Sequence, residues 1–318
     1  MKARLAMTVG DPRGIGPEVV AKALADSRVS ERCDVVVVGP EGAGVQVAES
    51  IGHWRPGPDA ALAGMLSGLA IERAVQMAQA GDVEGIVTAP IDKFALLAGG
   101  YDFPGHTEML AALTGSSVAM MLASDKLRVV LATTHIPLRS VVEKLSAATI
   151  VQAARITHSG LQTWFGIEAP RIALCALNPH AGDGGRFGSE DTNLLEPAAR
   201  AAGIEGPFPA DTVFVRAMRG EFDAVIAPYH DVGMTAIKVA SFGSAVNITL
   251  GLPFPRTSPD HGTALDIAGQ NRADPSSMIA ATLLCASIVS RAPRSGGRRA
   301  RADRPTETRS SARPSRAQ

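Results

Sequence analysis

The chain has 318 residues, of which 46% are hydrophobic and 19% are charged, and its formal net charge is zero. A chain of this length and composition can bury a large core, which favours two domains or one large α/β unit. Its apolar runs are far shorter than the roughly 18 residues of a membrane-spanning helix, and it begins without a secretory signal pattern. We therefore expect a cytoplasmic protein with no membrane contact.

The three cysteines, Cys33, Cys175 and Cys285, lie far apart within or beside apolar runs. This placement is typical of reduced thiols in a core. The odd number and wide spacing argue against a disulfide framework and against a metal site built from cysteines.

The zero net charge hides an asymmetry between the body of the chain and its C-terminal end. Residues 291–318 contain nine arginines, Asp303 and Glu307, so this segment carries +7 and residues 1–290 carry −7. The segment has no apolar periodicity, and it is rich in Arg, Ser, Pro, Ala and Gly, which predicts a disordered basic tail. Binding of nucleic acid or another acidic surface through the tail is the alternative, and we expect no nucleic-acid partner.

Taken in chain order, short apolar or β-branched runs predict strands at residues 5–9, 35–39, 85–90, 118–122, 128–133, 171–177, 223–227 and 245–250. Helical patterns lie between most of them, at residues 17–25, 60–79, 110–113, 147–165, 193–202 and 275–289. Strands that alternate with helices in this way predict an α/β fold with a mainly parallel sheet covered on both faces. Polar segments at residues 104–108, 133–139, 178–191, 229–238 and 256–262 are expected beyond the sheet.

Three histidines stand at the ends of three predicted strands. The run RVVLATTH ends at His135, RIALCALNPH at His180 and DAVIAPYH at His230. The carboxyl ends of parallel strands meet at one edge of a sheet, so these imidazoles can converge on one metal ion. Any single histidine is more readily explained as a structural side chain, but three at three strand ends favour a metal site. Three protein ligands leave a coordination position open, which is typical of a catalytic site.

A second set of residues is suited to binding anions. Lys238 follows His230 by eight residues, Asn247 lies in the run AVNITL, and Arg256 follows Pro255. His106 and Thr107 lie in the segment PGHTEML. Together they would supply cationic and neutral donors for a phosphate and a carboxylate. The alternative is that the two cations are solvated surface charges.

Other motifs leave their function open. The loop GDPRGIGPE at Gly10–Glu18 departs from the dinucleotide fingerprint G-x-G-x-x-G and favours a tight strand-to-helix turn. Asp231 and Asp183 could orient a metal-binding imidazole or could be turn residues. No nucleophile elbow G-x-S-x-G is present.

Nine segments, taken together, resemble one known family. They are GDPRGIGPE, TAPIDK, PGHTEML, ATTHIPLR, LNPHAGDGG, GPFPADTVF, YHDVG, VNITLGLPF and RTSPDHGTALDIAG, and they follow the family order from residue 7 to residue 278. This pattern is similar to the 4-hydroxythreonine-4-phosphate dehydrogenases of vitamin B6 biosynthesis, the PdxA family. The resemblance implies two α/β/α domains like those of isocitrate and isopropylmalate dehydrogenases. We assign residues 1–105 plus 265–290 to the first domain and 106–264 to the second.

The resemblance also implies roles for the candidate residues. His135, His180 and His230 match the metal ligands of the family, and zinc is favoured over magnesium or cobalt. The substrate-binding positions match His106, Thr107, Lys238, Asn247 and Arg256. Asp211, in the segment PADT, matches an acidic residue of the same site, and Lys238 or Asp211 is expected to assist proton removal.

The implied enzyme is a homodimer with its active sites at the subunit interface, and its cofactor is NAD or NADP. It would oxidise 4-phosphooxy-L-threonine to a 3-keto acid that loses CO2 to give 3-amino-2-oxopropyl phosphate. A related dehydrogenase acting on 4-phospho-D-threonate or D-erythronate is the alternative, and a non-catalytic metal-binding or nucleic-acid-binding protein is a distant one. Arg13, Val232 and Arg186 depart from the family pattern, and they leave the metal-binding positions unchanged.

Overall fold

The computed structural model describes residues 2–241 and 244–291. Within these ranges the chain forms one sheet of eleven strands, in the order β3-β2-β1-β4-β11-β10-β5-β6-β9-β7-β8. The strands are β1 (Ala3–Thr8), β2 (Cys33–Glu41), β3 (Glu49–His53), β4 (Gly85–Thr88), β5 (Ala119–Ala123), β6 (Arg128–Leu131), β7 (Ile172–Cys175), β8 (Glu205–Phe208), β9 (Ala224–Ala227), β10 (Val246–Leu250) and β11 (Arg256–Pro259). Apart from Arg291, the predicted disordered tail lies outside the described residues.

The sheet is mainly parallel, as the alternation of strands and helices predicted. Antiparallel pairing occurs only around its centre, where β10 pairs with β11 and β5, and β5 pairs with β6. The strands on either side of this centre form two parallel blocks, one from β3 to β11 and one from β6 to β8. The predicted α/β fold is confirmed.

Helices cover both faces of the sheet. They are α1 (Gly16–Ala25), α2 (Ser27–Arg32), α3 (Ala60–Ala80), α4 (Lys93–Ala98), α5 (His106–Thr114), α6 (Val141–Lys144), α7 (Ala147–Phe165), α8 (Glu196–Ala202), α9 (Ala210–Met218), α10 (His230–Ser241) and α11 (Ser276–Arg291). Capping residues set the ends of the long helices, as α7 shows. Ser146 caps α7 by accepting a hydrogen bond from the backbone N–H of Thr149, and Gly166 ends it in the left-handed conformation.

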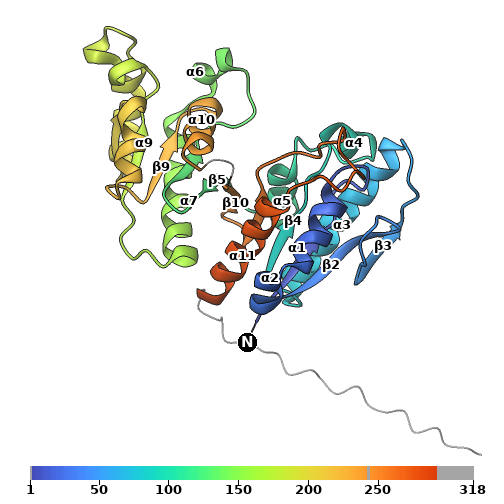
Figure 1. Ribbon diagram of the computed structural model, residues 1–318. Helices are drawn as coiled ribbons and strands as arrows, with labels where there is room; N and C mark the ends of the chain where they lie inside the picture. The colour runs from blue at the N-terminus through green and yellow to red at the C-terminus, as the bar shows by residue number, and fades with distance from the viewer. Residues whose placement is uncertain (1, 242–243, 292–318) are drawn as a thin grey trace, which may run out of the picture.

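The molecule has two lobes that share one core (Figure 1). The largest hydrophobic cluster runs through both, from Leu5 and Met7 in β1 to Ile150 in α7 and Ile248 in β10. Smaller clusters lie on the other face, under α3 and α5 in one lobe and under α9 and α10 in the other. The assigned domain boundaries stay a prediction. Met109 of α5, which follows the boundary at residue 105, packs in the cluster of the first lobe.

Several elements differ from the sequence-based expectation. The segment at residues 229–238 was expected to be a polar loop, but it forms most of α10. Its buried residues Gly233 and Ile237 face the sheet, and Gly233 lies against the side chains of Leu131 and Ala227. The strands β3, β8 and β11 were not predicted, because they are short and carry polar or glycine residues that give no apolar alternation. Among the described residues, no helix combines the length and the apolar character needed to cross a membrane.

Helices α3 and α4 pack closely at a glycine. A methyl group at Gly64 of α3 would overlap the backbone carbonyl of Ala95 in α4. We expect Gly64→Ala to lower the free energy of unfolding by about 1–3 kcal/mol, because a clash with backbone outweighs the gain in helix propensity. Urea unfolding measures the change, with Gly57→Ala as the control, since the nearest atom to a methyl group there is the carbonyl oxygen of Arg55 at 3.7 Å. Equal stability of the two variants would disprove the close approach.

Candidate active site

The three strands that precede the candidate metal ligands lie side by side. β6, β9 and β7 are neighbours in the sheet and run parallel, so their carboxyl ends meet at one edge as predicted. His230 is the first residue of α10, directly after β9, and His135 follows β6. The rings of these two histidines lie 5.4 Å apart between centroids. The sheet therefore brings two of the three candidates together.

His180 does not join them within one chain. It lies on the surface in a turn after β7, where it and the four residues that follow adopt positive φ angles, and its ring lies 6.2 Å from that of Phe187. No group of three or more potential metal ligands occurs among the described residues. The expectation that one chain brings all three histidines onto one ion is therefore not met. His180 stands in a turn with a left-handed backbone, which strand periodicity does not predict.

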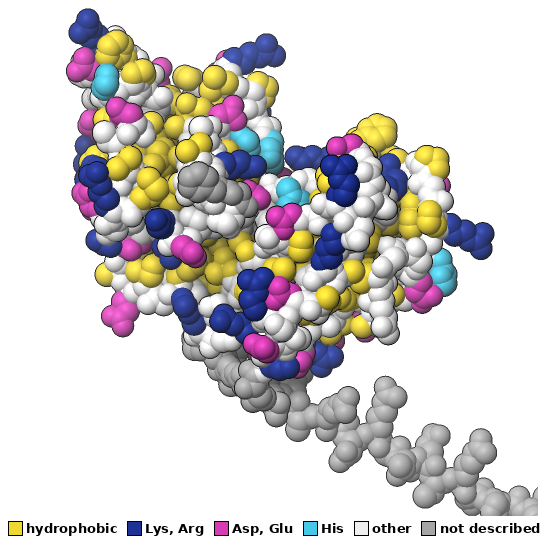
Figure 2. All heavy atoms as spheres, viewed as in Figure 1, with side chains coloured by type: hydrophobic (Ala, Val, Ile, Leu, Met, Phe, Trp, Pro, Cys, Tyr) yellow, Lys and Arg dark blue, Asp and Glu magenta, His cyan; other side chains and the backbone are white. Residues whose placement is uncertain are grey.

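A cavity of about 690 Å³ lies next to the histidine pair. Figure 2 shows a hollow between the two lobes with histidine and Lys or Arg side chains along it. All five predicted substrate-binding residues line the cavity, together with two of the three predicted metal ligands: His106, Thr107, Lys238, Asn247, Arg256, His135 and His230. Asp211 does not, since it is exposed in the first turn of α9. The structure thus gathers residues from β10, β11, α5 and α10 into one pocket.

Arg256 is the most unusual residue of this cavity. Its side chain is 1% exposed, and it donates hydrogen bonds to the hydroxyls of Thr88 at 2.6 Å and Thr249 at 3.0 Å. Among the described residues no carboxylate forms an ion pair with it, and burial lowers the pKa of Arg256 to about 9. A buried cation without a counter-ion is costly in the empty protein. The site is therefore suited to an anionic ligand.

His106 and Asn247 present unpartnered polar atoms beside this cation. Within the described part of the chain, neither Nε2 of His106 nor Oδ1 of Asn247 has a hydrogen-bond partner, and both atoms are buried. Burial and the positive charges of Arg256 and Lys93 hold the pKa of His106 well below its ordinary value, so its ring is neutral. His106 also begins α5, whose first N–H groups receive no side-chain cap. Free donors at a helix N-terminus bind anions, which agrees with the charge of Arg256.

The remaining polar residues orient the site. Nδ1 of His230 lies 2.7 Å from Oδ1 of Asp231, so this carboxylate fixes the imidazole as an orienting partner does. Lys238 lies 3.9 Å from Asp260, and its side chain is 50% exposed. Asp183 adopts a positive φ in the turn after β7, and among the described residues its side chain forms no hydrogen bond or ion pair.

Three residues in or near the cavity had no role predicted from the sequence: Lys93, Glu108 and Asp191. Lys93 and Glu108 line the cavity, and the segments TAPIDK and PGHTEML that contain them follow β4 and open α5. Asp191 is fully buried and accepts hydrogen bonds from the backbone N–H groups of Leu177 and Asn178, which fixes the end of β7. Lys93 could have been found from its position shortly after the predicted strand at residues 85–90. No local sequence pattern indicated a role for Asp191.

The chain has an α/β fold with a polar, cationic pocket between its two lobes. In fold, the chain is similar to a crystal structure of a beta-decarboxylating dehydrogenase from Thermococcus kodakarensis, with a TM-score of 0.51 at 14% identity over 88% of this chain and 81% of that one. A family model described as pyridoxal phosphate biosynthetic protein PdxA matches residues 15–285. The chain belongs to the PdxA family.

Individual relatives agree with this assignment. A 4-hydroxythreonine-4-phosphate dehydrogenase of Desulfosudis oleivorans is 43% identical over 316 residues, covering 87% of this chain and 93% of the relative. A D-threonate 4-phosphate dehydrogenase of Cupriavidus necator is 42% identical over 325 residues, covering 90% and 97%. The crystal structure of a 4-hydroxythreonine-4-phosphate dehydrogenase from Klebsiella pneumoniae has a TM-score of 0.81 at 38% identity, covering 91% of this chain and 98% of that one.

Proposed function

We propose that the protein is an oxidoreductase that oxidises the C3 hydroxyl of 4-phosphooxy-L-threonine in pyridoxal phosphate biosynthesis. The 3-keto acid formed loses CO2 and leaves 3-amino-2-oxopropyl phosphate. One observation carries the proposal: the cavity places Arg256, a buried cation that forms no ion pair among the described residues, in the same pocket as the histidine pair. The buried cation suits the phosphate of such a substrate, and the histidine pair, as a metal site, suits its hydroxyl. The family relationship and the names of the relatives support the same reaction.

Residues of the chain have distinct roles in this proposal. Arg256, His106 and Thr107 bind the phosphate at the N-terminus of α5. Lys238 lines the same cavity and is the better placed of the two candidates for assisting proton removal. Asp211 is exposed outside the cavity of its own subunit and would have to act from a partner subunit.

A divalent metal, zinc in preference to magnesium or cobalt, is part of the proposal. Burial and the charge of Lys93 lower the pKa of His135, which keeps its imidazole in the neutral form that binds metals. Asp231 holds Nδ1 of His230, which leaves Nε2 available. A bound metal ion would polarise the C3 hydroxyl of the substrate. Because His180 lies apart in its own chain, we propose that the protein is a homodimer in which His180 of the partner subunit completes the set.

Mixing two inactive variants tests this shared site. His135→Ala and His180→Ala should each be inactive as homodimers. If ligands are shared, each mixed dimer contains one intact site, and random exchange of subunits should restore about a quarter of the wild-type activity. Turnover after co-refolding or prolonged mixing measures this recovery. Failure of the mixture to gain activity, with subunit exchange shown by mass spectrometry, would contradict the shared site.

We propose NAD, with NADP as the alternative, as the cofactor that accepts the hydride. A second cavity of about 590 Å³ is lined by the Gly10–Glu18 loop and by residues 268–271. The segment from Asp260 to Asn271 passes from the first cavity to the second, so a dinucleotide there could reach the reacting carbon. The two cations of this cavity are already paired, Arg13 with Asp11 and Lys22 with Glu18. Paired cations suit NAD better than the additional phosphate of NADP.

The decisive assay supplies NAD or NADP with two phosphorylated substrates in turn. We expect reduction of NAD with 4-phosphooxy-L-threonine and release of CO2. Activity on 4-phospho-D-threonate alone would instead favour the second candidate function, for which the Cupriavidus necator relative is the specific observation. Inactivity with both substrates, in protein loaded with zinc, would contradict the proposal.

A further inference from the structure

Lys93 is a cation on the cavity wall that the proposed function does not place in contact with the substrate. It is the first residue of α4, and it lines the cavity together with His106, His135 and Arg256. Its stem runs over Gly105, since the position that a methyl group on Gly105 would occupy lies 3.7 Å from Cε of Lys93 and 3.6 Å from Oε2 of Glu108. Gly105 immediately precedes the free N-terminus of α5. The side chain therefore reaches toward the part of the cavity where anion donors already gather.

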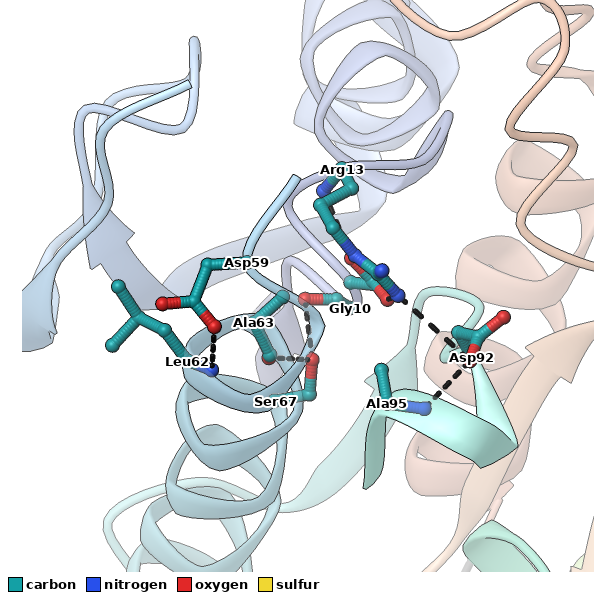
Figure 3. A network of polar contacts seen from close by, with 9 residues as sticks. Gly10, Arg13, Asp59, Leu62, Ala63, Ser67, Asp92 and Ala95 are labelled. Carbon is teal, nitrogen blue, oxygen red and sulfur yellow. Dashed lines mark hydrogen bonds and ion pairs between the residues drawn. The ribbon is translucent and has the colours of Figure 1, made fainter. Parts of the chain in front are cut away.

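The base of Lys93 is held in place by its neighbour Asp92. The carboxylate of Asp92 caps α4 by accepting a hydrogen bond from the backbone N–H of Ala95 at 2.7 Å, and it lies 3.8 Å from the guanidinium of Arg13 (Figure 3). Arg13 is itself fixed by Asp11 at 2.7 Å. This network ties the Gly10–Glu18 loop to the start of α4. The position of Lys93 is thus set by the fold, as a ligand-binding group requires.

Within the described part of the chain Lys93 forms no ion pair, although the carboxylate of Glu108 lies near its stem at Gly105. Three of its lining residues are cations, Lys93, Lys238 and Arg256, and two are acids, Glu108 and Asp260. Lys238 is close to Asp260, whereas among the described residues neither Lys93 nor Arg256 forms an ion pair. Two cations and one remaining carboxylate, Glu108, leave an excess of positive charge. A phosphate monoester carries a charge of about −1.5 to −2 at neutral pH, which this excess would help to balance.

We propose that Lys93 is a further substrate-binding residue, whose ammonium group binds the phosphate together with Arg256 and His106. The inference rests on the proposed function for the identity of the substrate. It adds to that function a cation on α4, the helix that follows β4. The phosphate would then be bound by the N-terminus of α5, Arg256 and Lys93 together.

The test uses Lys93→Met, which removes the charge and keeps the stem that packs over Gly105. Lys126→Met is the matched control, because Lys126 is an exposed lysine in the turn between β5 and β6 and outside the cavity. Two quantities are measured: the Kd of inorganic phosphate by calorimetry, and the KM and kcat for 4-phosphooxy-L-threonine. We expect Kd and KM to rise by about 10-fold or more with kcat nearly unchanged, as for loss of one charge-assisted hydrogen bond. Lys93→Arg should restore most of the affinity.

The outcomes separate this inference from the proposed function. Unchanged Kd and KM in Lys93→Met would overturn the inference, and so would a fall in kcat with Kd and KM unchanged. Wild-type protein that binds phosphate through Lys93 but does not oxidise the substrate would refute the proposed function and leave Lys93 as a phosphate-binding residue. If the methionine variant fails to fold, Lys93→Gln provides the same comparison.

Discussion

Substitution of His135 by alanine should remove the bound metal and lower kcat/KM by about 1,000-fold. His135 and His230 are the two imidazoles that one subunit contributes to the proposed metal site, and their rings lie 5.4 Å apart. A catalytic metal supplies several kcal/mol of transition-state stabilisation, and each 1.4 kcal/mol corresponds to about a factor of ten in rate. Metal content per subunit, measured by plasma mass spectrometry, and NAD reduction are the two readouts.

The control for this prediction is His158→Ala, because His158 is exposed on α7 and outside the cavity. It should retain metal and turnover. Metal content equal to that of the wild type in His135→Ala would remove this histidine from the site. Full activity of chelated, metal-free wild-type protein would contradict metal dependence altogether.

Replacement of Arg256 by methionine should lower kcat/KM by about 100-fold or more without lowering the unfolding temperature of the ligand-free protein. The guanidinium is buried, and its hydrogen bonds go to Thr88 and Thr249 rather than to a carboxylate. Loss of this cation removes a bidentate donor for phosphate, so binding suffers. Loss of an uncompensated buried charge removes a cost of folding, so stability should not fall.

Kinetics and thermal unfolding in phosphate-free buffer test the two parts of this prediction separately. Arg256→Lys is informative as a second variant, because it keeps the charge and loses the planar fork, and it should fall between the wild type and Arg256→Met. Arg200→Met, on the exposed face of α8, serves as the control. A large fall in the unfolding temperature of Arg256→Met would mean that Arg256 has mainly a structural role.

The order of strands around the histidines could be predicted because its signals are local. Apolar runs of strand length end at His135, His180 and His230, and helices lie between them, so neighbouring parallel strands follow from known topology rules. In the structure β6, β9 and β7 lie side by side and end at one edge of the sheet, as these rules predict. The part of this arrangement that could be predicted depends on strand order and direction alone.

The parts that sequence reading missed depend on tertiary contacts. The polar run of β11 becomes a buried strand only because β4 and β10 pair with it on either side. α10 contains Gly233, which weakens a helical pattern locally but allows close packing on Leu131 and Ala227. The left-handed turn at His180 has no periodic signature, so its separation from His135 could not be foreseen.

The path of the chain through β11 constrains how the protein can fold during synthesis. β11 pairs with β4, although 168 positions separate Arg256 from Thr88. Helix α11, which packs on β1, β4 and β11, comes later still. A nascent chain that has made all of β1–β4 therefore has an open strand edge at β4 until nearly the whole body has left the ribosome. Exposed edges invite pairing with other chains, so aggregation during translation should start at β4, and truncation before β11 should leave no soluble first lobe.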